Sequence, residues 1–326
     1  MQRNRVAEVS TLAKYSIVVP VYGNEEGIPF LLERLGEVTA ELGSDSEVVF
    51  VVDGSPDRSY EVLSELLPMS ALRTQLIRHS RNFGSFAAIR TGMAHATGEF
   101  IAVMAADLQE PPELVLDFFK VLNSGAADVA VGRREGRDDP LMSRLSSGAF
   151  WKIYKRWIFP DMPEGGVDIF ACNRAVAREI LALDESHSSL VGLLYWVGFR
   201  RAEISYRRQP REHGKSGWSF SKKLRYLLDS VFSFTDIPLS LLIGVGAIGS
   251  VLTVVAGAIV FIAFLAGAIQ EPGYTPLMMV VLFSTFSMLV ALGIVGSYVW
   301  RAFENTKRRP GAIVMSRWES DVRADR

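Results

Sequence analysis

The chain has 326 residues, and its 35 lysines and arginines nearly balance its 36 aspartates and glutamates. This balance leaves no global positive field, so a nucleic-acid partner is not expected. The single cysteine, Cys172, excludes an internal disulfide and fits a reducing compartment, where we expect a packed small residue rather than a nucleophile. The four histidines are scattered without the spacing of a zinc site.

Residues 1–13 contain basic residues but no apolar stretch of signal-peptide length, and are expected to form an N-terminal tail. From residue 14 to residue 218, apolar β-branched runs alternate with segments of helical periodicity. Strands are expected over 15–22, 46–54, 74–80, 100–107 and 128–133, and helices over 25–43, 55–67, 85–96 and 111–125. This alternation predicts an α/β domain with a mostly parallel sheet and helices on both faces.

Ligands of such sheets bind beyond the carboxyl ends of the strands. The polar residues that follow the expected strands should therefore converge, although they lie far apart in the sequence. They are Tyr22, Asn24, Glu25, Asp53, Arg81, Asn82, Asp107, Gln109 and Arg133.

Two later stretches mix basic and aromatic residues. Residues 144–159 place apolar and aromatic side chains on one helical face and basic side chains on the other, which suits either the membrane surface or packing on the sheet. Residues 213–234 have a similar composition and precede a long apolar stretch, so residues 219–236 are expected to form a juxtamembrane amphipathic helix.

No charged residue occurs in 237–270 or in 272–300. Each stretch exceeds the roughly 20 residues that cross a bilayer, which predicts two transmembrane helices within 237–301 and a short external loop near 270–276. Basic residues flank both stretches, so the large domain 14–218, the N-terminus and the C-terminal tail 302–326 should be cytoplasmic. These expectations describe a multi-pass protein of the inner (plasma) membrane.

Four blocks in this order resemble family 2 glycosyltransferases, namely "SIVVPVYGNEEG", "VVDGSPDRS", "RNFGSFAAIRTGM" and "ADLQEPPE". The similarity is to the branch that transfers a sugar to a polyprenyl phosphate, and the segments 213–239 and 293–310 extend it nearly to the end of the chain. The resemblance implies the GT-A nucleotide-sugar fold, an inverting reaction and a divalent cation, Mg²⁺ or Mn²⁺.

In that family an aspartate and a following glutamine bind the metal, and they match Asp107 and Gln109. Ala105 stands where the family has a further aspartate, so metal or nucleotide binding should be weaker. Glu110 is close enough in sequence to compensate. We expect an altered but working site.

The resemblance also implies nucleotide-sugar contacts from Pro20, Tyr22, Glu25, Asp53, Asn82 and Asp107. Asp53 matches the aspartate that binds the nucleotide base, although it could instead open the turn at 54–56.

Asp168 matches a family aspartate near the sugar and acceptor, and with Asp107 it forms the expected catalytic pair. Phe170 replaces the usual arginine two residues on, and the alternative for Asp168 is a helix N-cap. Basic partners for the acceptor phosphate are expected at Arg133, Arg208, Arg211, Lys215 and Ser216.

The expected function is transfer of one sugar, with UDP favoured as the nucleotide, to a polyprenyl phosphate, which gives a lipid-linked sugar for envelope glycan modification. Related proteins suggest a homo-oligomer such as a tetramer. Two alternatives stay open. One is a different lipid or polysaccharide acceptor, and the other is a non-catalytic membrane scaffold with a degenerate site.

Overall fold

The computed structural model describes residues 13–135, 162, 167–183, 185, 189–209, 228, 231–232, 235, 237–266 and 274–320. The chain divides into two compact units. One comprises residues 1–184, 189–220 and 310–326, and the other comprises residues 185–188 and 221–309. The expected amphipathic helix at 144–159 and most of the stretch 213–234 lie outside the described residues.

Eight strands of the first unit form one sheet in the order β7-β5-β6-β4-β1-β2-β3-β8. Their bounds are β1 Tyr15–Val21, β2 Ser46–Val52, β3 Thr74–His79, β4 Phe100–Val103, β5 Val129–Arg134, β6 Phe170–Asn173, β7 Arg201–Tyr206 and β8 Val314–Glu319. The five strands predicted from the sequence are confirmed within a few residues at their ends.

The centre of the sheet is parallel, as the alternation of strands and helices predicted. β1 pairs in parallel with β2 and with β4, and β2 pairs in parallel with β3. Pro20 lies in β1 beyond Val18, the last residue of β1 that pairs with β4. The missing N–H of this proline therefore leaves that ladder intact.

Strand β6 runs antiparallel to both of its neighbours, β4 and β5. β6 therefore begins at the sheet edge where the parallel strands end. Asp168, two residues before β6, is brought to that edge by this reversal.

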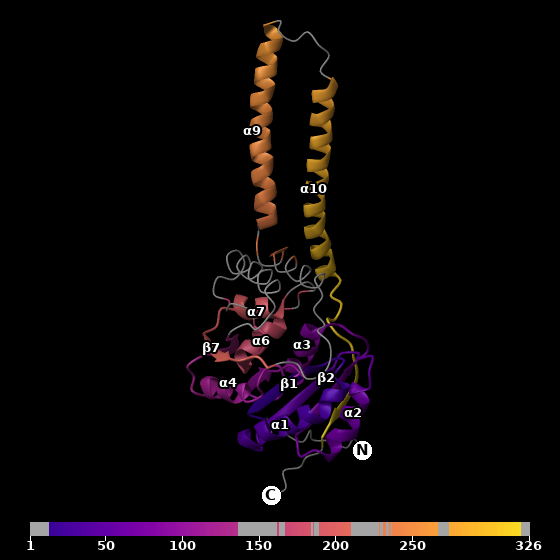
Figure 1. Cartoon of the computed structure of the whole chain (residues 1–326), viewed down its shortest axis with the longest axis vertical. Helices are drawn as coiled ribbons and strands as arrows, with labels where there is room; N and C mark the ends of the chain where they lie inside the picture. The colour runs from indigo at the N-terminus through magenta and orange to yellow at the C-terminus, as the bar shows by residue number, and fades with distance from the viewer. Residues whose placement is uncertain are drawn as a thin grey trace, which may run out of the picture. The chain divides into compact units, whose positions relative to one another are not determined.

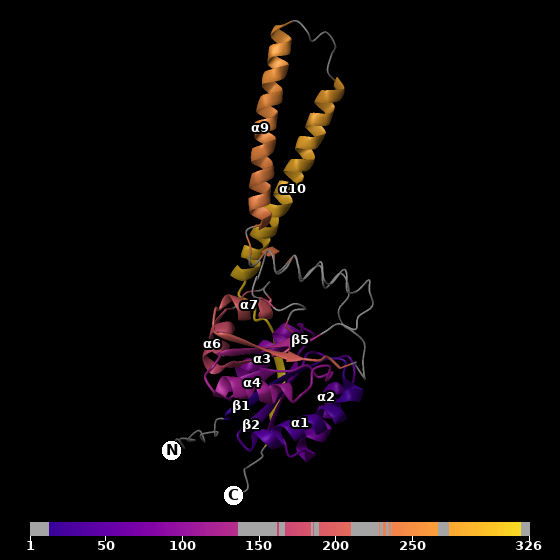
Figure 2. The same ribbon diagram turned by 60° about the vertical axis from the view of Figure 1, so that its left-hand side comes forward.

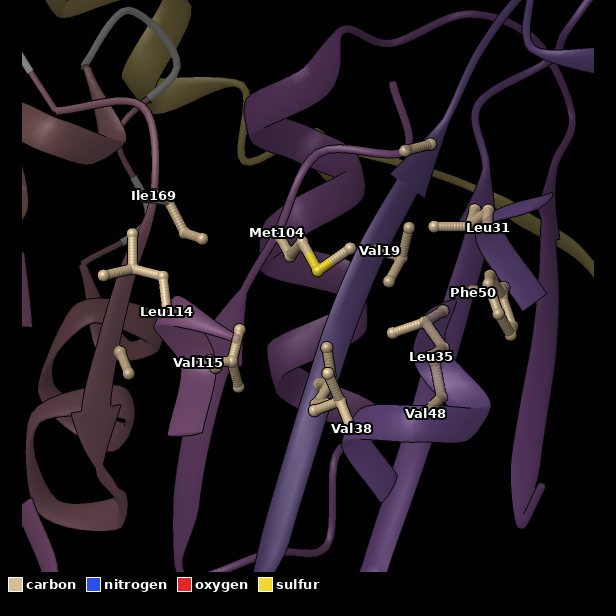
Figure 3. Packing of buried hydrophobic residues seen from close by; sticks show 14 of the residues in the cluster. Val19, Leu31, Leu35, Val38, Val48, Phe50, Met104, Leu114, Val115 and Ile169 are labelled. Atoms are coloured by element: carbon tan, nitrogen blue, oxygen red, sulfur yellow. The ribbon is translucent and has the colours of Figure 1, made fainter. Parts of the chain in front are cut away.

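Helices cover both faces of the sheet (Figures 1 and 2). The larger core packs α1 (Ile28–Leu42), α2 (Ser59–Leu66) and α4 (Leu114–Asn123) on one face, where Leu31 and Leu35 of α1 lie near Phe50 and Val19 (Figure 3). The second core packs α3 (Ser85–His95), α6 (Arg174–Ala182) and α7 (Leu190–Trp196) on the other face. Short 3₁₀ turns occur at Glu25–Gly27 and Leu67–Met69. Cys172 is buried in the second core, which confirms the expectation of a packed residue.

The C-terminal residues add a strand that the sequence did not indicate. β8 pairs antiparallel with β3, the outer parallel strand, and Trp318 packs against the larger core. The segment had been expected only as part of the C-terminal tail 302–326. Pairing with β3 supplies the hydrogen-bond partners that make it a strand.

The first charge-free stretch contains α9 (Ile237–Leu265), and α10 (Tyr274–Thr306) begins in the second and continues past it to Thr306. Across the part of the chain that the structure describes, however, no helix has both the length and the apolar character needed to cross a membrane. This finding overturns the prediction of two transmembrane helices and of a multi-pass inner-membrane protein. The prediction had rested on the length of the two stretches and on their lack of charged residues.

Candidate active site

The turn after β4 brings Asp107 and Gln109 together. Leu108 between them has a φ of 52°, in the left-handed region that a branched residue rarely adopts. The backbone N–H of Gln109 lies 3.4 Å from Oδ1 of Asp107. Backbone strain of this kind costs free energy and is found where a site fixes side-chain directions. The carboxylate of Asp107 therefore contacts the backbone of Gln109 within this turn.

Glu110, the next residue of this turn, is buried with 2% of its surface exposed. Burial raises the pKa of its carboxyl group to about 7, and the nearby carboxylates of Asp168 and Asp107 add to the rise, while Arg208 opposes it. Three acidic side chains therefore lie close enough to interact. Glu110 therefore lies beside Asp107 and Asp168, the expected catalytic pair.

Asp168 is held by a residue that sequence reasoning missed. The hydroxyl of Tyr206, the last residue of β7, donates to Oδ2 of Asp168 at 3.3 Å. Burial raises the pKa of this phenol well above its ordinary value, and Asp168 and Glu110 raise it further, so the hydroxyl stays a donor. The N-cap of α6 is Asn173, whose side chain accepts from the N–H of Val176 at 3.0 Å. The alternative N-cap role for Asp168 is thereby removed.

Arg208 approaches the same turn from the segment after β7. Its Nη2 donates to Oε1 of Gln109 at 2.7 Å, and its Nε lies 3.6 Å from Oε1 of Glu110. The N–H of Gln209 donates to the backbone oxygen of Gln109 at 2.8 Å, which joins the two segments. Of the residues expected to bind the acceptor phosphate, Arg208 is thus placed next to the expected metal ligands.

Asp53 is buried at the end of β2, and the protein itself uses both of its carboxylate oxygens. Oδ1 contacts Nδ1 of His79 at 2.8 Å and accepts from the N–H of Phe83 at 2.9 Å, and Oδ2 accepts from the N–H of Gly84 at 2.7 Å. Nε2 of His79 in turn contacts the hydroxyl of Thr91 at 3.0 Å. In this structure Asp53 fixes the segment that follows β3.

Glu25 belongs to a reciprocal pair with Asp57. The N–H of Glu25 donates to Oδ2 of Asp57 at 3.0 Å, and the N–H of Arg58 donates to Oε2 of Glu25 at 3.0 Å. Hydrogen bonds from Ser55 and Ser59 hold the pKa of Asp57 below its usual value despite the opposing effect of burial. Sequence reasoning passed over Asp57, although its position among serines before α2 is typical of a capping residue.

Asn24 connects this first loop to the turn after β4. Its side-chain Nδ2 donates to the backbone oxygen of Ala106 at 3.0 Å, and its N–H donates to the hydroxyl of Ser59 at 3.2 Å. The loops after β1, β2 and β4 are therefore tied together at one edge of the sheet.

The remaining predicted residues are more peripheral or undescribed. Tyr22, 54% exposed, and Asn82 present their side chains to solvent at the ends of β1 and β3. Arg133, also exposed, lies 3.7 Å from Glu203 of the neighbouring strand β7. Arg211, Lys215 and Ser216 lie outside the described residues.

The donor set suits a hard divalent cation that also binds substrate. Asp107 and Gln109 offer oxygen atoms, which Mg²⁺ and Mn²⁺ prefer. In the described part of the chain no cluster of three or more histidine, cysteine, aspartate or glutamate side chains could hold a metal on its own. A cation bound here would complete its shell with water and phosphate oxygens, as Mg²⁺ commonly does at nucleotide sites.

Comparison with known proteins is consistent with this site. Residues 16–181 match the glycosyl transferase family 2. The chain is 31% identical to an uncharacterized glycosyltransferase of Synechocystis over 93% of this chain and 95% of that protein. It is 32% identical to the putative glycosyltransferase CsbB of Bacillus subtilis, over 92% and 90% of the two chains. It is 28% identical to the prophage bactoprenol glucosyl transferase homolog of Escherichia coli, over 92% of this chain and 98% of that protein.

The matched residues contain the turn with Asp107 and Gln109, the buried Asp53 and the strand that positions Asp168. The mixed α/β sheet with its polar residues gathered at one edge agrees with this match. The chain is a glycosyltransferase and belongs to glycosyltransferase family 2.

Proposed function

We propose that this enzyme transfers one sugar from a nucleotide sugar, with UDP favoured, to a polyprenyl phosphate with inversion at the anomeric carbon. The observation that carries the proposal is the placement of Arg208, a side chain suited to binding phosphate, against Gln109, one of the expected metal ligands, at 2.7 Å. Donor and acceptor sites would then meet at the turn after β4. Relatives named bactoprenol glucosyl transferase, similar over nearly their whole length, support the choice of acceptor.

The reaction forms a bond between an oxygen of the acceptor phosphate and the anomeric carbon. The bond from that carbon to the diphosphate breaks on the opposite face, and the nucleoside diphosphate leaves with the electron pair. An acceptor phosphate is already ionised, so no side chain has to remove a proton from it. The protein then has to position two anions and stabilise the leaving group.

Asp107 and Gln109 would hold Mg²⁺ or Mn²⁺, which supplies a Lewis acid that neutralises the leaving diphosphate. Asp168, oriented by Tyr206 at 3.3 Å, would bind sugar hydroxyls. The loops fixed by Asp53 and by the Glu25–Asp57 pair would form the nucleotide side of the site. Ala105 leaves one carboxylate fewer than the family has, and Glu110 would place a carboxyl group beside Asp107 and Asp168.

The test is a transfer assay with undecaprenyl phosphate, Mg²⁺ or Mn²⁺, and a panel of labelled UDP- and GDP-sugars. We expect label to enter the lipid phase with one donor, and expect this transfer to be lost in Asp107→Ala and on chelation. Transfer to another lipid or to a polysaccharide instead would identify a different acceptor. No transfer together with no metal-dependent nucleotide binding would support the alternative of a non-catalytic scaffold.

A further inference from the structure

Arg208 is a cation that the fold places against the acidic groups of the site. Its Nη2 donates to Oε1 of Gln109 at 2.7 Å, and its Nε lies 3.6 Å from Oε1 of Glu110. Glu110 also interacts electrostatically with the negative charges of Asp168 and Asp107. The guanidinium therefore balances negative charge at the position where the proposed function requires a metal.

A divalent cation on Asp107 and Gln109 would meet this guanidinium at close range. The oxygen of Gln109 that accepts from Arg208 is the same oxygen that would bind the metal. Glu110 is 2% exposed and Arg208 is 28% exposed, so solvent screens two neighbouring positive charges poorly here. Metal binding and the contact between Arg208 and Gln109 should therefore exclude each other.

The Arg208 contact is also incomplete. Among the described residues, Nε of Arg208 is one of the few buried side-chain atoms that make no hydrogen bond. A buried donor without an acceptor costs free energy, so this arrangement is easier to leave than a fully bonded one. A phosphate group offers oxygens in the geometry that the guanidinium fork matches.

From these contacts we infer that Arg208 exchanges with the metal: its guanidinium occupies the Gln109 oxygen while no metal is bound there. When the metal and the donor diphosphate bind Asp107 and Gln109, the guanidinium leaves Gln109 and binds the acceptor phosphate. The inference rests on the proposed function and deepens it, because it sets an order in which the donor binds before the acceptor.

The test measures Mn²⁺ binding to the full chain in the presence of UDP, with free Mn²⁺ detected by electron paramagnetic resonance. Arg208→Gln is compared with the wild type and with Arg207→Gln, which removes the same charge from the exposed neighbouring residue. We expect Arg208→Gln to bind Mn²⁺ about 5-fold more tightly, since a competing cation is gone. We also expect its KM for undecaprenyl phosphate to rise, and both values to stay unchanged in Arg207→Gln.

Unchanged or weaker Mn²⁺ binding by Arg208→Gln would overturn the exchange but leave the proposed function intact, because the wild type would still bind metal and transfer sugar. No Mn²⁺ binding by the wild type would overturn both. If Arg208→Gln does not fold, Arg208→Met replaces it, because methionine keeps much of the apolar length of the side chain and removes its charge. We expect this variant also to bind Mn²⁺ more tightly than the wild type, and equal affinity would contradict the exchange.

Discussion

At the scale of single residues, the site depends on side chains that orient other side chains. Tyr206 is 5% exposed and touches Asp168 through its hydroxyl, while the rest of its ring packs in the larger core. Such a residue positions the aspartate without contacting the reacting atoms. Its effect should therefore appear in turnover rather than in folding.

We expect Tyr206→Phe to lower kcat about 5-fold, because a hydrogen bond worth about 1 kcal/mol is lost while the ring stays in place. Steady-state kinetics and a melting curve measure the two effects separately. Tyr60→Phe is the control, since its hydroxyl contacts Ser316 of β8 instead of a site carboxylate. A large drop in Tm with unchanged kcat would show that Tyr206 is only structural.

The substitution Asp53→Asn distinguishes the two roles considered for Asp53, which are contact with the nucleotide base and a structural role in the surrounding loops. The amide group can accept through one atom only, so the contacts to Phe83 and Gly84 cannot both survive. We expect the free energy of unfolding to fall by about 2 kcal/mol and the affinity for UDP to fall with it. Urea unfolding and calorimetric UDP titration measure both, with the exposed Asp45→Asn as control. Lost UDP affinity at full stability would instead indicate direct contact with the base.

At the scale of elements, β8 completes the sheet by covering an outer parallel strand. Besides the ladder with β3, the N–H of Ser80 donates to the backbone oxygen of Ile313 at 3.0 Å, and the N–H of Ser320 donates to that of Thr74 at 2.9 Å. Without β8, strand β3 would present unpaired N–H and C=O groups, and such edges pair with other chains.

Deletion of residues 311–326 should therefore lower the Tm by about 5 to 10 °C and promote aggregation. Deletion of 321–326 alone retains the strand and should leave the Tm unchanged. Differential scanning fluorimetry and light scattering compare the two proteins. Equal Tm values would show that β8 adds nothing to the stability of the sheet.

At the scale of the whole molecule, Cys172 reports on global opening. It lies in β6 between two other strands, and burial raises the pKa of its thiol from 9.0 to about 12. At pH 8 it should react with a thiol reagent only as fast as the domain unfolds. The rate of reaction with Ellman's reagent, measured for the native chain and for the chain in urea, tests this expectation. Fast labelling of the native chain would contradict the buried position of Cys172.

The raised pKa of the Cys172 thiol also makes the free energy of unfolding depend on pH. The thiol is protonated in the folded state and ionises more readily when unfolded, so its contribution is fully present below pH 9.0 and is lost as the pH rises toward about 12. Cys172→Ala should remove this part of the loss of stability at alkaline pH. Urea unfolding at several pH values measures it.

The sequence by itself determined the parallel centre of the sheet, because its strands contain continuous apolar runs, such as 48–52 in β2, and each is followed by an amphipathic helix. It also indicated which loops form the candidate site, since the polar residues directly follow those strands. The family match confirms the glycosyltransferase that these motifs indicated.

Only the tertiary structure decided how the site is built. Asp168 reaches the site because β6 runs against its neighbours, and Tyr206 and Arg208 reach it because β7 ends there. These contacts join residues about 40 to 100 positions apart, and no local pattern encodes such pairings. For the same reason β8 was missed, since a short strand of mixed composition becomes a strand only when the edge of β3 pairs with it.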